Sequence, residues 1–228
     1  MKISILFSLI SVALVGCKGS DLPTKPNDLS FDGIYANNEA VMLVDTTLTH
    51  GAIVANGSHI LSFDGFTKND ESMTFKRTHL GLKNGDYEYS AYSTMSALFS
   101  NNNVQTIANL STIGTMFTYD LSKQPRSLPL SELVGRHETA AGQITEINAD
   151  GTFTSYANTL GCIYNGTLKM TKGIYYSSTV AVTDCAKSGT YNGYFFTVNK
   201  SNQTKLLAIY RGETNESYIV WGETPITK

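Results

Sequence analysis

Asx-Gly dipeptides recur along this chain between short runs of β-forming residues, and this pattern constrains the fold most. Such dipeptides supply the positive φ angles that tight hairpin turns need. We interpret as turns Asn56-Gly57, Asp64-Gly65, Asn84-Gly85, Asp150-Gly151, Asn165-Gly166 and Asn192-Gly193. The predicted strands include 41–45, 60–63, 73–77, 87–92, 143–148, 152–156, 163–170, 175–183, 191–198, 205–211 and 218–221. This spacing predicts an all-β, antiparallel body that is barrel- or sandwich-like.

Helical signal is confined to the segment 127–134. Pro129 suits a first helical turn and Gly135 suits a stop, so one short helix is expected there. We expect this helix to open a second half of the chain, at 125–228, after a first half at 31–124.

The two halves resemble each other in sequence. Residues 31–35 resemble 133–137, 62–65 resemble 163–166, and 116–119 resemble 207–210, at offsets of 102, 101 and 91 positions. Because the order is kept, an internal duplication is the favoured interpretation. The alternative is that β proteins share Gly-aromatic and Asn-Gly patterns by composition alone.

The first residues predict a removable signal segment. Lys2 precedes an apolar run to Val15 of the length of a signal-peptide core, which is too short for a spanning helix. The sequence Leu14-Val15-Gly16-Cys17 resembles the lipobox of bacterial lipoproteins. The resemblance implies cleavage after residue 16, lipid on Cys17 and a flexible tether at 17–30. Lys18, at the position after Cys17, resembles the pattern of lipoproteins that are sorted to the outer membrane. The resemblance implies that the protein faces the periplasm or the cell surface.

Charge and composition exclude some partners. The chain has 17 Lys and Arg against 19 Asp and Glu, a net charge of −2, and cleavage after residue 16 would make it −3. Without a basic excess, a nucleic-acid partner is not expected. A hydrophobic content of 41% with 16% charged residues is typical of a globular chain rather than a disordered one.

Cysteine usage predicts a disulfide. If Cys17 carries lipid, Cys162 and Cys185 remain, and an even remainder outside the cytosol favours pairing. Two free thiols or a metal pair are the alternatives, but no Cys-x-x-Cys and no neighbouring His supports a metal.

The second half carries motifs that resemble a group of duplicated all-β bacterial lipoproteins of largely uncharacterised function. The motifs are Gly135-Arg136-His137, Asp150-Gly151-Thr152, the segment 161–166 (Gly-Cys-Ile-Tyr-Asn-Gly), Cys185 and the segment 189–193 (Gly-Thr-Tyr-Asn-Gly). The resemblance implies an extracytoplasmic β body with the two cysteines bridged, and it implies no catalytic residue.

No catalytic or metal signature is evident. The histidines His50, His59, His79 and His137 lack metal-ligand spacing, and we interpret them as surface polar residues. The alternative is that His50 and His59 face each other across the Asn56-Gly57 hairpin as two metal ligands, with no third ligand assigned. Gly-x-Ser-x-Gly and Ser-x-x-Lys are absent, and Glu138, Glu146 and Asp150 are interpreted as solvated carboxylates. We predict no catalytic residue, no metal and no cofactor.

Tyrosines are the residues that most clearly indicate a contact surface in this sequence. Tyr175, Tyr176, Tyr191 and Tyr194 cluster in the second half, where tyrosine serves either a core or a rigid amphipathic surface. Since Tyr175 and Tyr176 are consecutive strand residues, one of them should be at least partly exposed.

These observations lead to a functional hypothesis. We expect a membrane-anchored, non-enzymatic binding module with a protein partner, of which an immunity protein against a secreted effector is one form. The alternatives are a small-ligand carrier with a cavity inside a barrel and a hydrolase whose site contains His137 beside a carboxylate and a hydroxyl.

Overall fold

The computed structural model describes residues 30–82, 86–110, 114–139, 141–157, 161–212 and 219–226. Several predicted features lie outside these residues: the signal segment 1–16, Cys17, most of the tether 17–30, the Asn84-Gly85 turn and Tyr218. The strands of the first half are β1 (Gly33–Ala36), β2 (Ala40–Val44), β3 (Ala52–Asn56), β4 (His59–Lys68), β5 (Ser72–Leu82), β6 (Tyr87–Ser100), β7 (Asn103–Leu110) and β8 (Thr115–Lys123). The helix α1 (Leu130–Leu133) follows. The remaining strands are β9 (Gly135–Glu138), β10 (Ile144–Ile147), β11 (Thr152–Ala157), β12 (Cys162–Thr167), β13 (Lys169–Thr171), β14 (Tyr175–Thr183), β15 (Gly189–Lys200), β16 (Gln203–Gly212) and β17 (Ile219–Pro225).

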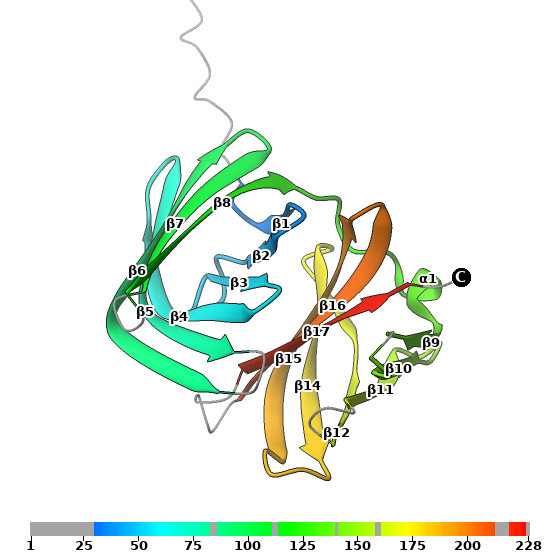
Figure 1. The fold of residues 1–228 in the computed structure, drawn as a ribbon. Helices are drawn as coiled ribbons and strands as arrows, with labels where there is room; N and C mark the ends of the chain where they lie inside the picture. The colour runs from blue at the N-terminus through cyan, green and yellow to red at the C-terminus, as the bar shows by residue number, and fades with distance from the viewer. Residues whose placement is uncertain are drawn as a thin grey trace, which may run out of the picture.

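The first half is a closed antiparallel barrel in which β1 to β8 follow one another in chain order. It closes where β1 pairs with β8, with Tyr35 opposite Lys123 and Ala36 opposite Ser122. Closure leaves no free sheet edge in this half. Figure 1 shows this barrel beside the second half.

The second half is a nearly closed antiparallel sheet. Its order is β17-β16-β15-β14-β12-β11-β10-β9, and β13 pairs with β14 beside this path. Among the described residues no hydrogen-bonded register joins β9 to β17. The all-β prediction with two similar halves is therefore confirmed.

The predicted short helix is also confirmed. Helix α1 begins after Pro129, which has a φ of −62° and serves as N-cap residue, and it ends before Val134. Gly135 then starts β9 with a φ of 133°, a conformation that side chains disfavour.

Two of the three sequence similarities fall on equivalent strands. The first pair falls on β1 and β9, the first strand of each half, and the second on β4 and β12, the fourth. Tyr35 Oη donates to the carbonyl of Phe31 (3.0 Å), and His137 Nε2 donates to the carbonyl of Leu133 (2.8 Å), so these two residues make the same i−4 contact. The third pair is wrong, because 116–119 lie in the last strand of their half and 207–210 in the last but one.

Three apolar clusters form the core. One fills the closed barrel, with Phe63, Phe75, Met42, Met95 and Phe99 among its members. A second lies inside the second half, and a third joins the outer faces of the two halves. Large side chains such as Phe63, Phe75 and Phe99 therefore lie inside the barrel.

The third cluster explains why a strand such as β2 is apolar along its whole length. Val41 and Leu43 point to the interface between the halves, whereas Met42 and Val44 point into the barrel. Strands covered on both faces read as apolar runs rather than alternating ones. The outer wall of β6–β8 is solvated and exposes five large side chains: Tyr89, Tyr92, Leu98, Ile107 and Met116.

Three predicted turns are wrong. Asp64-Gly65, Asn165-Gly166 and Asn192-Gly193 lie inside β4, β12 and β15. Gly166 and Gly193 occupy inward positions where a Cβ atom would approach Phe153 to 2.8 Å and Val180 to 2.7 Å, respectively. Packing, not turn geometry, accounts for these two glycines. By contrast, Asn56-Gly57 does connect β3 to β4, and Gly151 has a φ of 85° between β10 and β11.

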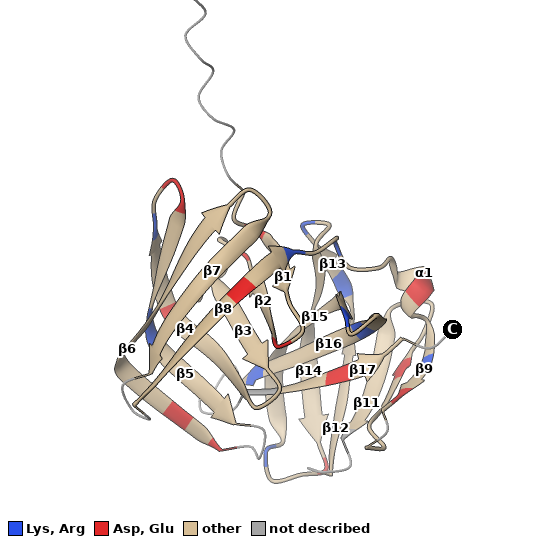
Figure 2. Ribbon diagram, turned by 45° about the horizontal axis from the view of Figure 1, so that its top comes forward, with Lys and Arg blue, Asp and Glu red and all other residues tan. Residues whose placement is uncertain are grey.

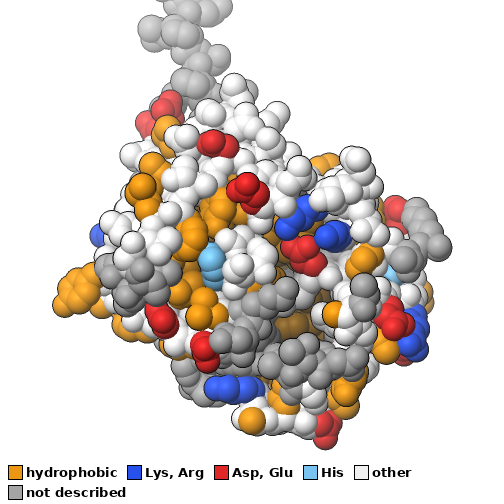
Figure 3. Space-filling view, viewed as in Figure 1, with side chains coloured by type: hydrophobic (Ala, Val, Ile, Leu, Met, Phe, Trp, Pro, Cys, Tyr) orange, Lys and Arg blue, Asp and Glu red, His pale blue; other side chains and the backbone are white. Residues whose placement is uncertain are grey.

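Charged residues are sparse along the strands (Figure 2). On the face seen in Figure 3, acidic and basic side chains are dispersed or adjacent to one another and form no basic surface. Within the described residues no helix is both long and apolar enough to cross a membrane.

Candidate functional site

A groove of about 580 Å³ lies at the border between the two halves. One wall is the turn after β2, with Asp45, Thr47 and Leu48, and the other wall is built from residues of β12–β15. Residues of the second wall are Gly166, Thr167, Lys169, Thr171, Tyr175, Ser177, Ser178, Thr179, Asn192, Gly193 and Tyr194. The groove therefore exists only because the halves pack together.

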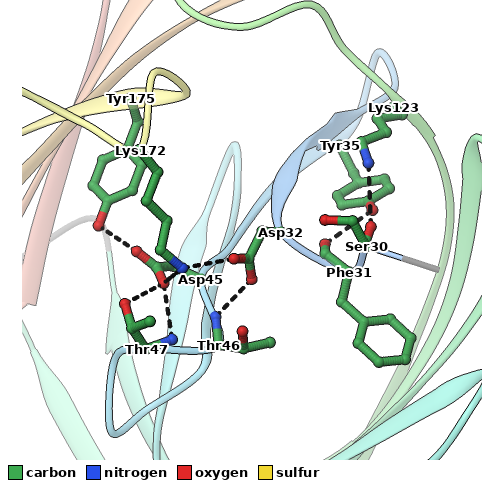
Figure 4. A network of polar contacts seen from close by, with 10 residues as sticks. All are labelled: Ser30, Phe31, Asp32, Tyr35, Asp45, Thr46, Thr47, Lys123, Lys172 and Tyr175. Atoms are coloured by element: carbon green, nitrogen blue, oxygen red, sulfur yellow. Dashed lines mark hydrogen bonds and ion pairs between the residues drawn. The ribbon is translucent and has the colours of Figure 1, made fainter. Parts of the chain in front are cut away.

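A polar network built on Asp45 holds the two walls together (Figure 4). The Asp45 side chain is 1% exposed, and its Oδ1 accepts hydrogen bonds from the Thr47 backbone N–H (2.9 Å) and hydroxyl (2.6 Å). Lys172 Nζ lies 2.6 Å from the same oxygen, and Tyr175 Oη donates to Oδ2 at 2.9 Å. Lys172 and Tyr175 belong to the second half, so Asp45 receives donors from both sides of the border.

Lys172 is shared between two carboxylates. Its Nζ also lies 2.6 Å from Asp32 Oδ2, and Asp32 Oδ1 accepts the backbone N–H of Thr46 at 2.8 Å. Charge-assisted hydrogen bonds of this kind are short and strong. The network therefore positions the turn after β2 against the β13–β14 turn.

Electrostatics assign this network a positioning role. Burial alone would raise the pKa of Asp45, but hydrogen bonds from Lys172, Thr47 and Tyr175 outweigh burial and lower the pKa to about 2. Burial opposes the charge on Lys172, but the contacts with Asp32 and Asp45 raise its pKa overall. A carboxylate with so low a pKa and a firmly protonated amine are poor general bases near neutral pH.

The face of the second wall presents polar side chains in register. Thr179 of β14 lies opposite Asn192 of β15, which lies opposite Arg211 of β16. Two residues away from Thr179 on β14, Ser177 lies opposite Tyr194 of β15. The Ser177 hydroxyl contacts the Thr171 hydroxyl at 2.8 Å. Cross-strand neighbours have Cβ atoms about 5 Å apart, so these groups form a continuous polar surface.

His50 lies behind this surface. The residue is 2% exposed, its ring packs edge-on against Tyr194 with centroids 5.5 Å apart, and its Nε2 is buried without a hydrogen-bond partner. Burial, with a smaller contribution from Arg211, lowers the pKa of His50 to about 3. His50 is therefore neutral near pH 7.

The structure corrects the tyrosine prediction. Tyr175, Tyr176, Tyr191 and Tyr194 are all buried, at 1%, 3%, 4% and 5% exposure. The expectation that Tyr175 or Tyr176 is exposed is wrong because the sheet is covered on both faces: Tyr175 joins the interface cluster and Tyr176 the second interior. Tyr175 and Tyr194 do form part of the groove wall.

The predicted disulfide is confirmed. Cys162 and Cys185 are bonded, with Cα atoms 4.9 Å apart. The bond links the start of β12 to the segment after β14, and Cys162 is buried in the second interior. It therefore braces the sheet that carries one wall of the groove.

The interpretation of the histidines as surface residues is wrong for His50, His79 and His137, which are 2%, 2% and 1% exposed. His59 packs against Phe117 and not against His50, so the two do not form a ligand pair. Within the described residues, no group of three or more His, Cys, Asp or Glu side chains is placed to hold a metal ion.

The remaining histidines have structural contacts. His79 is hydrogen-bonded through Nε2 to Asp64 and through Nδ1 to Tyr87. His137 bonds to the Leu133 carbonyl, and its Nδ1 is buried without a hydrogen-bond partner.

The carboxylates considered for catalysis lie on the surface. Glu138 and Glu146 pair with Arg136 at 3.3 and 3.5 Å, and all three side chains are more than half exposed. Asp150 accepts hydrogen bonds from Thr152 in the β10–β11 turn. The interpretation of these groups as solvated carboxylates agrees with this placement.

Sequence reasoning missed Asp32, Asp45 and Lys172. Asp45 carried a signal, since it directly follows the apolar run 41–44. Lys172 carried none, because its partner lies 127 positions earlier in the chain. Comparisons with protein-family models, curated proteins and solved structures find no match to this chain.

Proposed function

We propose that this chain is a non-enzymatic binding module, lipid-anchored through Cys17 at the bacterial outer membrane, that holds its partner in the groove between its halves. The groove is the observation that carries the proposal. Its walls come from both halves and are joined by the Asp45–Lys172 contact of 2.6 Å. A site held in its binding geometry loses little conformational entropy when a ligand binds.

The partner is proposed to be a protein facing the module from the periplasm or the cell surface. A groove of about 580 Å³ has room for a loop or an attached group of a partner, which would gain further contacts at the rim. An immunity protein that neutralises a secreted effector is one form of this proposal, and the identity of the captured protein decides it.

The test is a crosslinked pull-down of the native lipidated protein from its own cells. Thr179→Arg places a long cation on the exposed groove wall, and Thr118→Arg makes the same change on the exposed outer face of β8. We expect one stoichiometric protein with the wild type and with Thr118→Arg, and at least tenfold less with Thr179→Arg. Equal capture by all three would place binding outside the groove.

The anchor has its own test. Metabolic labelling with a palmitate analogue should label the wild type and not Cys17→Ser, because the thiol is the acceptor of the lipid. Each buried methylene contributes about 0.8 kcal/mol, so an acylated protein should fractionate with membranes and Cys17→Ser with the soluble fraction. Label retained in Cys17→Ser would contradict the proposal that the lipid is attached to Cys17.

A further inference from the structure

Residues with a hydroxyl group are the commonest kind in the lining of the groove. Hydroxyl-bearing residues make up more than half of its lining, and Asn192 adds a carboxamide. A hydroxyl both donates and accepts hydrogen bonds, and a carboxamide offers both functions at its two ends. Pockets for apolar ligands are lined mostly by hydrophobic side chains, which this groove is not.

The charges at the groove are largely neutralised. The oxygens of Asp45 accept from Thr47, Lys172 and Tyr175, and Lys172 is shared with Asp32. Lys169 is the exposed cation of the described lining. A ligand with a large net charge would therefore find little compensation in this groove.

We infer that the groove takes an uncharged saccharide. This inference rests on the proposed function, because it assigns a ligand class to the same groove. Hydroxyls of Thr167 and Thr179 and the amide of Asn192 hydrogen-bond the sugar hydroxyls, and Leu48 contacts its C–H face. The saccharide is either a free glycan or a glycan carried by the partner protein.

This surface discriminates by hydrogen bonding. A buried polar group that loses its hydrogen-bond partner destabilises the complex. A site built to bind hydroxyls therefore rejects analogues that lack them. Deoxygenated analogues of a bound sugar should bind at least tenfold more weakly.

The first experiment measures binding to the full-length lipidated protein in a detergent without a sugar headgroup, by saturation-transfer NMR and calorimetry. The probes are maltopentaose and N-acetylchitopentaose as neutral sugars, trigalacturonate as an acidic sugar, and tetra-alanine as a peptide. We expect at least one neutral sugar to bind, with less than a twofold change in Kd between 50 and 500 mM NaCl. Thr179→Arg should weaken this binding at least tenfold, and Thr118→Arg should not.

Three results overturn the inference. These are no binding of either neutral sugar, binding of trigalacturonate alone with a steep salt dependence, and neutral-sugar binding that survives Thr179→Arg. The first would remove the ligand class, the second would make Lys169 an anion site, and the third would place the sugar elsewhere.

The second experiment separates this inference from the proposed function. Mild periodate, which cleaves vicinal diols, is applied to the captured partner before rebinding, and the neutral sugars are added as competitors to a parallel sample. Loss of rebinding after periodate identifies a glycan on the partner, and loss with competitor alone identifies a free glycan as the natural ligand. If rebinding resists both treatments but is still weakened by Thr179→Arg, the proposed binding module is supported and the saccharide inference is contradicted.

Discussion

Lys172 Nζ lies 2.6 Å from Asp45 Oδ1, and this contact joins two halves of the chain across 127 positions. The Lys172 side chain is 30% exposed, whereas that of Asp45 is 1% exposed. Asp45 would be left buried without its counter-charge if Lys172 were removed. The contact therefore connects the stability of the interface to the shape of the groove.

The first prediction concerns this ion pair. Lys172→Met should lower the free energy of unfolding by about 3 kcal/mol, because removing one partner of a buried pair leaves an uncompensated charge. Urea denaturation followed by tyrosine fluorescence measures the change. Lys169→Met is the matched control on the adjacent strand, and as an exposed surface change it should stay within about 0.5 kcal/mol. Equal stability of the two variants would show that the contact contributes nothing.

The second prediction concerns His50, whose pKa burial lowers to about 3. Since the unfolded chain binds this proton at about pH 6.5 and the folded chain does not, stability should fall as pH decreases from about 6.5 toward 3. One such proton gives a slope of about 1.4 kcal/mol per pH unit.

His50→Phe should remove that part of the slope, leaving the contribution of His59, whose pKa is also lowered by burial. Direct observation comes from NMR of the imidazole Cε1–H group. A His50 resonance that titrates between pH 6 and 7 in the folded protein would contradict this prediction.

The third prediction concerns a lower pH window. The folded-state pKa of Asp45 is about 2, below its ordinary value of 3.8, so its contribution to stability is present above about pH 4 and is lost between about pH 4 and 2. Glu223 also has a lowered pKa: hydrogen bonds and charges from Lys200 and Lys205 outweigh its burial. Asp45→Asn and Glu223→Gln should each flatten the acid limb of the stability curve, and the double variant should flatten it further. An Asp45→Asn curve parallel to the wild type would mean that Asp45 protonates normally in the fold.

The fourth prediction concerns the disulfide. Cys162→Ser opens a loop whose ends are 23 positions apart, and the chain-entropy model assigns such a loop about 3 kcal/mol. The melting temperature under oxidising conditions should fall accordingly. In a reducing buffer that breaks the bond, wild type and variant should melt within about a degree of each other. An unchanged melting temperature in oxidising buffer would show that the bond does not constrain unfolding.

Local signals in the sequence predicted much of the fold. Strand runs, the Pro129 and Gly135 boundaries of α1 and the even pair of remaining cysteines each act over a few residues or by simple counting. They were sufficient for the all-β class, the two halves, the helix and the disulfide. The same local rule was wrong for Gly166 and Gly193, where a neighbouring strand or side chain, and not a turn, requires glycine.

The tertiary structure alone decided the candidate site. Tyr175 and Tyr176 alternate correctly on β14, but only the packing of one half on the other buries both of them. Asp45, Lys172 and the polar wall around Thr179 come together because two outer sheet faces meet, and such contacts depend on partners more than a hundred positions apart. Periodicity and turn signals report which face of a strand a residue occupies; they carry no information on which distant face will cover it.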